Sequence, residues 1–482
     1  MAPLSEEVIN QIAQQVALRL RGVAGAEAVE TPQSSTNKQS LGRGVFPDID
    51  SAVAAAERAF RELSQMTLNK RVEIIDNIRK KMRQHSDELA KMAHEETGLG
   101  RYEDKRKKNE LVIEKTPGPE ILEPGAFSGD RGLTLLERAP FGVVGSITPT
   151  TNPTSTIINN TISIVSAGNS VVFNVHPNAV NVSLYNVRLI NDAIVEAGGP
   201  ENLVATVATP TVESAQQLMT HKKVRLIAVT GGAGVVKAAM ASGKRAICAG
   251  PGNPPVVVDE TADIELAAKQ IVFGASLDNN IICVDEKEVF VVDSVADMLL
   301  DAFSWNNAIV LTSDQVQQLE KVIFTEVRGP RKPGVINKKY IGKNVQVILS
   351  QIGLQVDSHI RLAIAPVEED HPLVWTEQMM PVLPVVRVSD VHKAIALAKE
   401  AEHGFGHSAV MYSKNLDHLS KMARVMNTSI FVKNGPAVAG LGYGGEGYTS
   451  FTIASPTGEG LTTARTFSRE RRCVLVDHFR IV

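Results

Sequence analysis

One cysteine of this sequence stands among residue types that could carry chemistry. The stretch "DNNIICVDEKEV", residues 278–289, places Cys283 behind two asparagines and ahead of two acids. A cysteine attacks as its thiolate, and a thiolate needs positive potential or hydrogen-bond donors around it. The side-chain amides of Asn279 and Asn280, with nearby backbone N–H groups, could serve both the thiolate and a developing oxyanion. Cys283 is therefore the candidate nucleophile, and the alternative is a buried structural thiol.

A second candidate is the stretch "ITPTTNPTST", residues 147–156, which begins where an apolar run ends. Loops at the carboxyl ends of strands line the binding crevice of open α/β sheets. Pro149 and Pro153 stiffen this loop and leave Asn152 between them as a rigidly placed amide donor. The alternative is a proline-rich turn without a chemical role.

A third candidate is the glycine pair in "VTGGAGVVKAAM", residues 229–240. An apolar strand runs into Gly231 and Gly232, and a helix follows. Bare N–H groups at the start of a helix suit a phosphate or a closely pressed cofactor ring. The stretch lacks the GxGxxG spacing, so a tight turn is the alternative. A literal GxGxxG at 442–447 has no strand before it and no helix after it, and we expect a plain loop there.

The other cysteines, the basic runs and the histidines favour structural roles. We expect Cys248 and Cys473 to be inert, packed thiols. The runs "KRKK" at 105–108 and "RERR" at 469–472 are short enough to be solvated faces. The "HGFGH" stretch at 403–407 has i,i+4 spacing, but its two glycines argue against the helix that would align the rings. We therefore expect no metal site.

The bulk composition bounds the class of protein. A chain of 482 residues is too long for one core, so two or three domains are expected. The formal net charge of −3 gives no reason to expect nucleic acid or an anionic membrane as partner. Three widely separated cysteines fit a reducing cytosol. No apolar run approaches the roughly 18 residues of a transmembrane helix.

The hydrophobic pattern predicts an α/β fold with parallel sheets. Residues 48–97 are typical of two helices, the second ending at Gly98, and strand-like and helix-like segments alternate from there on. Such alternation predicts a parallel sheet with helices on both faces. The strands expected first are 141–148, 170–175, 203–209 and 224–232. A second series runs from 256 to 432, which predicts two lobes joined near 250–256.

The N-terminal residues are expected to stand apart from this body. Residues 1–21 have the apolar spacing of an amphipathic helix, and 22–42 are small, polar and aperiodic, like a flexible linker. A short helix on a flexible tether cannot hide its apolar stripe within itself. It docks either on the body of the same protein or, as the second hypothesis, on another protein.

Taken together and in this order, the motifs resemble the aldehyde dehydrogenase superfamily over about 45–482. "PFGVVGSITPTTNP" is similar to the strand and loop that end in the oxyanion asparagine, here Asn152. "NNIICV" is similar to the nucleophile strand, here Cys283, and "TEQMMPVLPVVRV" to the segment whose glutamate holds the nicotinamide ribose, here Glu377. "AGNSVVFNVHP" resembles the adenosine-ribose strand. The cofactor-binding residues that the resemblance implies are Thr148, Pro149, Asn174, His176, Gly231, Gly232 and Glu377.

The resemblance also implies a fold. It consists of two Rossmann-like lobes, one for the cofactor and one for catalysis, and a small β arm that joins subunits into a homodimer or homotetramer. The implied domains are residues 43–120 with 141–255 for the cofactor, 256–446 for catalysis, and 121–140 with 465–482 for the arm.

Two departures from the family pattern refine the expected chemistry. Hydrolytic members carry a water-activating glutamate where this sequence has "CAGPGNPP", with Ala249 at about that place. Without a base, water attacks a thioester slowly, whereas a thiol such as coenzyme A needs less help. This pattern is that of the CoA-acylating branch. The family's ribose lysine is replaced by Asn174, with His176 nearby, which leaves the choice between NAD and NADP open; NAD is the expected cofactor and NADP the alternative.

The N-terminal helix and the ending "RRCVLVDHFRIV" resemble CoA-acylating propionaldehyde and acetaldehyde dehydrogenases of bacterial microcompartments. The resemblance implies a cytoplasmic enzyme whose residues 1–21 bind shell or core proteins of such a compartment. Propionaldehyde is the expected substrate and acetaldehyde the alternative. A hydrolytic aldehyde dehydrogenase that makes free acid and a non-catalytic scaffold remain as other classes.

Overall fold

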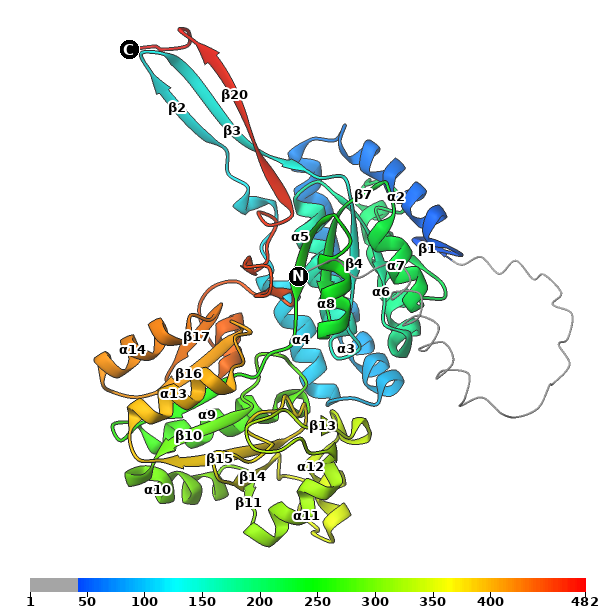
Figure 1. Cartoon of the computed structure of the whole chain (residues 1–482). Helices are drawn as coiled ribbons and strands as arrows, with labels where there is room; N and C mark the ends of the chain where they lie inside the picture. Colours follow the sequence, from blue (N-terminus) through cyan, green and yellow to red (C-terminus); the bar gives the residue numbers. More distant parts are fainter. Residues whose placement is uncertain (1–41) are drawn as a thin grey trace, which may run out of the picture. The chain divides into compact units, whose positions relative to one another are not determined.

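The computed structural model describes residues 42–482 (Figure 1). The predicted N-terminal helix, 1–21, lies outside the described residues, as does the predicted linker, 22–42, except for its last residue. In the part of the chain that is described, no helix is both long and apolar enough to cross a membrane.

The first sheet has six parallel strands in the order β1-β6-β5-β4-β7-β8. Its strands are β1 (Val45–Phe46), β4 (Val143–Ile147), β5 (Ser170–Asn174), β6 (Val204–Val207), β7 (Val224–Thr230) and β8 (Arg245–Ala249). The four strands expected first from the sequence are confirmed as β4 to β7. They are rich in valine and isoleucine and almost continuously buried, as strands covered on both faces must be.

Helices cover both faces of the first sheet. The chain forms α2 (Ile49–Leu63), α3 (Leu68–Thr97), α4 (Tyr102–Lys115), α5 (Pro153–Ser166), α6 (Val180–Glu196), α7 (Val212–Thr220) and α8 (Ala233–Met240). One core joins α3, α5 and α6 to the sheet, and a second core joins α2, α7 and α8 to it. Both helices predicted within 48–97 are present. The second ends where Gly98, at φ 63°, takes a left-handed backbone and donates to the His94 carbonyl.

The second sheet has seven parallel strands in the order β11-β14-β15-β10-β9-β16-β17. Its strands are β9 (Pro255–Val258), β10 (Glu288–Val292), β11 (Ala308–Val310), β14 (Leu362–Pro366), β15 (Val382–Val388), β16 (Ser408–Tyr412) and β17 (Ile430–Lys433). The helices of this part are α9 (Ile264–Ser276), α10 (Asp293–Ser304), α11 (Ser313–Ile323), α12 (Val345–Leu349), α13 (Val391–Ala401) and α14 (Leu416–Met426). The first sheet ends at Ala249 and the second begins at Pro255, which is where the sequence predicts the joint between lobes.

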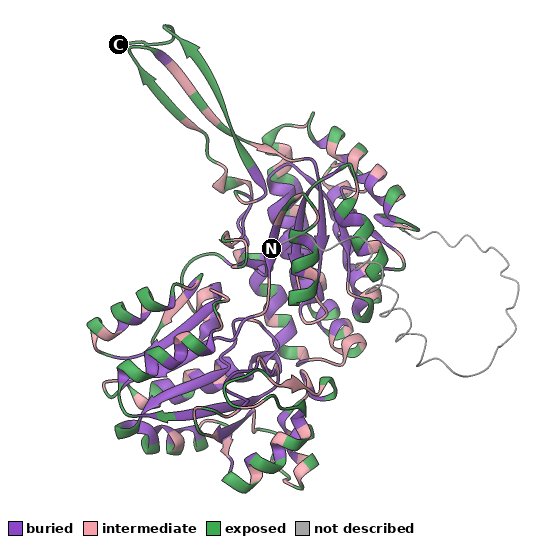
Figure 2. Ribbon diagram, in the orientation of Figure 1, coloured by how far each residue is buried: buried purple, intermediate pink, exposed green. Residues whose placement is uncertain are grey.

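A third sheet is antiparallel and mostly exposed. It pairs β2 (Gly125–Gly129), β3 (Gly132–Pro140) and β20 (Ser468–Val476), and β20 follows β3 over nine residue pairs. Figure 2 shows this sheet largely in green, while the two parallel sheets are purple. Residues 469–472 are exposed on β20, as expected. Cys473 is exposed as well, so the prediction that it is packed is wrong, because a strand of this thin sheet has no core to enter.

Two small two-stranded sheets complete the described chain. They pair β12 (Phe324–Glu326) with β13 (Val335–Ile336) and β18 (Ile453–Ala454) with β19 (Gly460–Leu461). Residues 442–447, the literal GxGxxG, form a loop of turns and bends as expected.

Candidate active site

Cys283 lies in a turn between a short 3₁₀ segment (Leu277–Asn280) and β10, so the expectation of a nucleophile strand is wrong. Three consecutive residues before it have left-handed backbone: φ is 47° at Asp278, 57° at Asn279 and 64° at Asn280. Asp and Asn tolerate this conformation better than other non-glycine residues, because their short polar side chains bond locally. The Asp-Asn-Asn run thus builds a tight loop that a strand could not provide.

The two asparagines hold this loop and do not serve the thiol. Asn279 Nδ2 donates to the Gly342 carbonyl at 2.9 Å. Asn280 Nδ2 donates to the carbonyls of Ala275, at 2.8 Å, and Glu286, at 2.9 Å. Since both hydrogens of the Asn280 amide are taken by backbone oxygens, the prediction that these amides face the thiolate or oxyanion is wrong.

Two lysines of the "KRKK" run point inward from α4, which corrects the expectation of a solvated face. Lys105 and Lys108 are 2% and 4% exposed. Both bind the carboxylate of Asp278, Lys105 at 3.2 Å. Burial lowers the pKa of Lys105 to about 8, against the opposing charge of Asp278. The ammonium of Lys108 also donates to Oδ1 of Asn152 at 2.6 Å.

Asn152 is oriented by this contact. It lies at the N-cap of α5 and is buried. A lysine ammonium only donates, so the amide atom that faces Lys108 is the oxygen, and the NH₂ group points elsewhere. One hydrogen of Nδ2 has a partner in Oγ1 of Thr151 at 3.2 Å, which leaves the other for a bound group. The bridge from Asn152 through Lys108 to Asp278 ties this amide to the loop of Cys283.

The thiol of Cys283 is partly exposed, and its surroundings disfavour the charged thiolate. Burial, and then the charge of Glu377, raise its pKa to about 12, while the charge of Lys287 acts in the opposite direction. Glu377 Oε1 accepts a hydrogen bond from the Gly252 N–H at 3.4 Å, and burial raises its pKa. The stretch 248–250, in contrast, offers no acid.

His407 is a further candidate site residue, although its spacing to His403 in the sequence suggests only a metal motif. A Cβ added at Gly252 would lie 2.9 Å from the Cys283 carbonyl oxygen and 3.0 Å from the imidazole of His407, so glycine brings the two together. Nδ1 of His407 contacts Ser408 Oγ at 2.7 Å, and the buried Nε2 has no hydrogen-bond partner among the described residues. Burial lowers its pKa to about 4, which keeps the ring neutral.

Five of the seven predicted cofactor residues lie at the carboxyl ends of three neighbouring strands. Thr148 and Pro149 follow β4, Asn174 ends β5, and Gly231 and Gly232 follow β7. In the sheet, β4 lies between β5 and β7, so the strand order reverses at β4. In open α/β sheets this switch point is where ligands bind.

The side chains at this edge fit a bound group. Oγ1 of Thr148 is buried without a partner, and a Cβ on Gly232 would meet nothing within 4 Å, so a polar atom and open space are both present. Asn174 is different, because its Oδ1 accepts from Ser214 Oγ at 2.5 Å and its Nδ2 donates to the Thr211 carbonyl at 3.3 Å.

His176 lies just beyond the end of β5. Its Nδ1 accepts from the Asn178 N–H at 3.1 Å, and burial lowers the pKa of its ring. The ring is therefore held in its neutral form beside the strand end.

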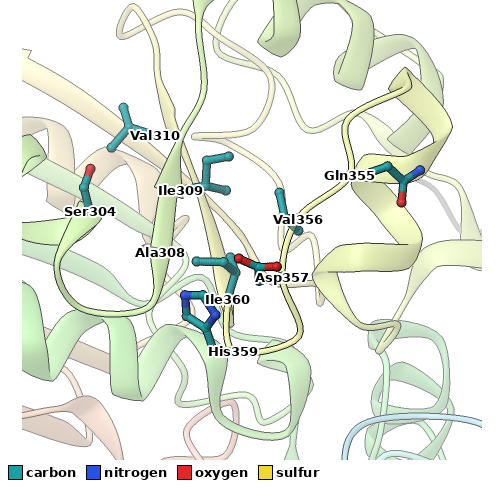
Figure 3. Close-up of a pocket in the computed structure, with 9 residues that line it drawn as sticks. All are labelled: Ser304, Ala308, Ile309, Val310, Gln355, Val356, Asp357, His359 and Ile360. Carbon is teal, nitrogen blue, oxygen red and sulfur yellow. The ribbon is translucent and has the colours of Figure 1, made fainter.

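Two other features of the described residues lie apart from this site. A hollow of about 550 Å³ lies beside the edge strand β11, and none of the predicted site residues lines it. Figure 3 shows the side chains that line it. Asp259, Glu260 and His418 could together face a metal ion. The carboxylate of Asp259 is already bound by Thr261, Ser413 and His418, so its oxygens have protein partners.

A switch point in one parallel sheet and a loop-borne cysteine ahead of a strand of the other are features that a cysteine-dependent dehydrogenase would use. The chain belongs to the aldehyde dehydrogenase family, since the model described as "Aldehyde dehydrogenase family" matches residues 24–456. Its full-length relatives are CoA-acylating members, so the expected class is confirmed: an oxidoreductase that acts on an aldehyde with coenzyme A as co-substrate.

Three relatives illustrate the match. Acetaldehyde dehydrogenase (acetylating) EutE of Salmonella typhimurium is 49% identical, over 99% of this chain and 100% of its own. A propionaldehyde dehydrogenase from the Clostridium phytofermentans fucose utilisation bacterial microcompartment is 46% identical, with TM-score 0.88 over 91% of this chain and 100% of its own. Rhodopseudomonas palustris propionaldehyde dehydrogenase, solved with bound CoA and an acylated cysteine, is 49% identical, with TM-score 0.87 over 90% and 98%.

Proposed function

We propose that this protein converts propanal to propanoyl-CoA, with NAD as hydride acceptor and Cys283 as the carrier of the acyl group. The observation that carries the proposal is the bridge that fixes Asn152 to the Cys283 loop through Lys108 and Asp278. This bridge supports a single site that contains both the nucleophile and the oxyanion donor, although the two residues are more than a hundred positions apart in the chain.

The first step is attack of the Cys283 thiolate on the aldehyde carbonyl carbon. Asn152 Nδ2 and the backbone N–H of Cys283 donate to the oxygen as it gains charge. One such donor is typically worth roughly 3–4 kcal/mol of transition-state stabilisation. Lys108 contributes by holding Oδ1, so that the amide needs no reorientation when the oxyanion forms.

Thr148, Pro149, Gly231 and Gly232 would hold the nicotinamide cofactor at the switch point, and Glu377, before β15 of the second sheet, would contact it from that side. The cofactor, when bound, would supply the hydride acceptor, and Cys283 would keep the acyl group as a thioester. Oδ1 and Nδ2 of Asn174 are already hydrogen-bonded to Ser214 and Thr211. We therefore propose that the end of β5, beside His176, favours NAD over NADP.

Coenzyme A, as co-substrate, then takes the acyl group. No acid stands at Ala249 to activate water, so the thioester waits for a thiol. Neutral His407, with Nε2 free beside the Cys283 loop, is the group that takes the thiol proton.

Replacing His407 with asparagine should separate the two half-reactions. The thioester should still form, because Cys283 and Asn152 are untouched, but transfer to coenzyme A should slow by about 10²-fold or more, the usual weight of a general base. A rapid burst of NADH, close to one per subunit, followed by slow turnover would show this. The matched control is His403→Asn in the same stretch, which should turn over normally. Equal loss of burst and turnover would contradict the assignment.

The function itself is tested by product analysis with two-, three- and four-carbon aldehydes, with NAD or NADP, and with or without coenzyme A. We expect propanoyl-CoA as the main product, acetaldehyde as the second substrate and little free acid. Relatives that act on either aldehyde support both substrates. Rapid formation of propanoate without coenzyme A would indicate that Glu377 activates water, and the enzyme would then be hydrolytic.

We further propose that the β2–β3–β20 sheet joins subunits into a dimer or tetramer, which the exposed apolar side chains of Phe127, Val474 and Val476 support. We also propose that residues 1–21 bind shell or core proteins of a bacterial microcompartment, which the microcompartment origin of a 46% identical relative supports. Deleting 1–21 should abolish co-sedimentation with compartments and leave the melting temperature unchanged. A lower melting temperature with unchanged location would favour packing on the protein's own body.

A further inference from the structure

Lys287 is a buried cation directly beneath the loop of Cys283. Its side chain is 0% exposed. Its ammonium donates to the Asn280 carbonyl at 2.9 Å, to Asn280 Oδ1 at 2.6 Å and to the Ile282 carbonyl at 3.3 Å. These three oxygens use all three ammonium hydrogens. No carboxylate among residues 42–482 forms an ion pair with it, whereas Lys105 and Lys108 share Asp278.

A buried charge without an ionic partner costs free energy, so its retention calls for a reason. The acids beside Lys287 do not supply the missing charge. Burial raises the pKa of Asp285 and Glu288 well above their usual range, and that of Glu286 to about 7, which favours their uncharged forms. Among the described residues the ammonium thus binds neutral oxygens, and a thiolate at Cys283 would give it an anionic counterpart.

The contact between the Lys287 ammonium and the Ile282 carbonyl also affects the backbone N–H of Cys283. The Ile282 carbonyl and the Cys283 N–H belong to the same peptide group. A cation that binds the carbonyl oxygen polarises the peptide and strengthens its N–H as a donor. The Cys283 N–H is the proposed second donor to the oxyanion, so Lys287 acts on it through a single peptide.

The charged and titratable groups around Cys283 and Lys287 come from several elements. They are Asp278, Asp285, Glu286 and Glu288 from the loop and β10, Lys108 from α4, Glu377 before β15, Glu402 at the end of α13, and His407 before β16. Lys105 and Lys108 both contact the carboxylate of Asp278. Among the described residues around the thiol, Lys287 is the lysine with no carboxylate at ion-pair distance.

We propose that Lys287 is a positioning residue that supplies the counter-charge of the Cys283 thiolate and polarises the Ile282–Cys283 peptide toward the oxyanion. The inference rests on the proposed role of Cys283, but it is tested without turnover. If Cys283 ionises against Lys287, removing the charge makes the thiolate harder to form. The pH midpoint of thiol reactivity then moves upward.

The test compares Lys287→Gln with Lys287→Arg, both in a Cys473→Ser background because Cys473 is exposed. Glutamine can still donate to the carbonyls but carries no charge. The rate of iodoacetamide alkylation of Cys283 is followed by peptide mass spectrometry across pH. Lys287→Gln should lower the alkylation rate at a given pH below the midpoint by about tenfold or more, the loss of thiolate that corresponds to a midpoint raised by about one unit. Lys287→Arg should restore the wild-type midpoint.

Lys105→Gln is the matched control, because it removes a buried lysine whose charge is already paired with Asp278. It should leave the midpoint unchanged. A merely structural role of Lys287 would lower the melting temperature of Lys287→Gln without moving the midpoint, and that result would overturn the proposal.

A measurement on the protein with Lys287 intact decides the question if Lys287→Gln does not fold. A buried counter-charge is not screened by salt, whereas exposed charges are. The alkylation midpoint should therefore be the same in about 0.05 M and about 0.5 M NaCl, over which the Debye length falls severalfold. An upward shift with salt would assign the stabilisation to surface cations and refute the role of Lys287.

Discussion

Cys283→Ala is expected to abolish the aldehyde- and CoA-dependent formation of NADH. In the proposed mechanism the substitution removes the atom that bonds to the carbonyl carbon, and neither of the other two cysteines can replace it. Cys248 is fully buried, with its pKa raised by burial to about 11, and Cys473 lies on β20 of the exposed sheet. Loss of a covalent nucleophile commonly costs about 10⁴-fold or more in kcat.

The experiment follows NADH absorbance with propanal and coenzyme A, and it needs two controls. Cofactor binding, measured by calorimetry, should stay close to that of the unaltered protein, because the switch-point residues are untouched. Cys473→Ser, the matched removal of a thiol far along the chain, should keep full activity. Turnover by Cys283→Ala above about a thousandth of normal would refute the nucleophile, since only the residual activity of binding and orientation should remain.

The effect of pH on the same reaction follows from the raised pKa of Cys283. Burial and Glu377 favour the neutral thiol, so the reactive thiolate becomes more populated as pH rises toward that pKa. In the proposed mechanism Cys283 therefore depends on a neighbouring cation, and the charge of Lys287 lowers the pKa of the thiol.

The parallel strands, and the strand ends that carry the candidate site, could be predicted from the sequence because their signals are local. Runs such as 170–175 and 224–232 are apolar, β-branched and bounded by glycine or polar turns, and each formed the expected strand. The residues just after these strands therefore lie together at the carboxyl edge of one sheet, independently of how the side chains pack. Thr148 and Gly231 are examples of site residues that a strand end alone locates.

The charge network could not be predicted because its partners are distant in the chain. "KRKK" has the composition of a solvated face, and nothing near it indicates that Lys108 meets Asp278, 170 residues away. His407 was missed for a related reason. Its place depends on the close approach of Gly252, while its spacing to His403 suggested only a metal motif. The left-handed run before Cys283 did leave a signal, since consecutive Asp and Asn residues favour that backbone.

Asn152→Ala is expected to lower kcat by about 10² to 10³-fold, the typical cost of losing one oxyanion donor. The amide contributes to the transition state more than to the bound aldehyde, so KM should change little. The fold should survive, because Lys108 keeps Asp278 and the α5 N-cap makes no side-chain capping bond that the change would remove. Stopped-flow NADH formation in the first turnover is the appropriate measurement, since it isolates the acylation step.

Asn109→Ala is the matched control for this change. Asn109 is also a fully buried asparagine, one residue after Lys108, and its amide bonds the Ser86 carbonyl and Thr154 Oγ1. Removing it should lower the melting temperature without a comparable loss of first-turnover rate. If both variants lost stability and rate in proportion, Asn152 would be a packing residue, and the oxyanion would have to rely on the backbone N–H of Cys283 alone. If only Asn152→Ala slows acylation, the amide that Lys108 orients is the donor.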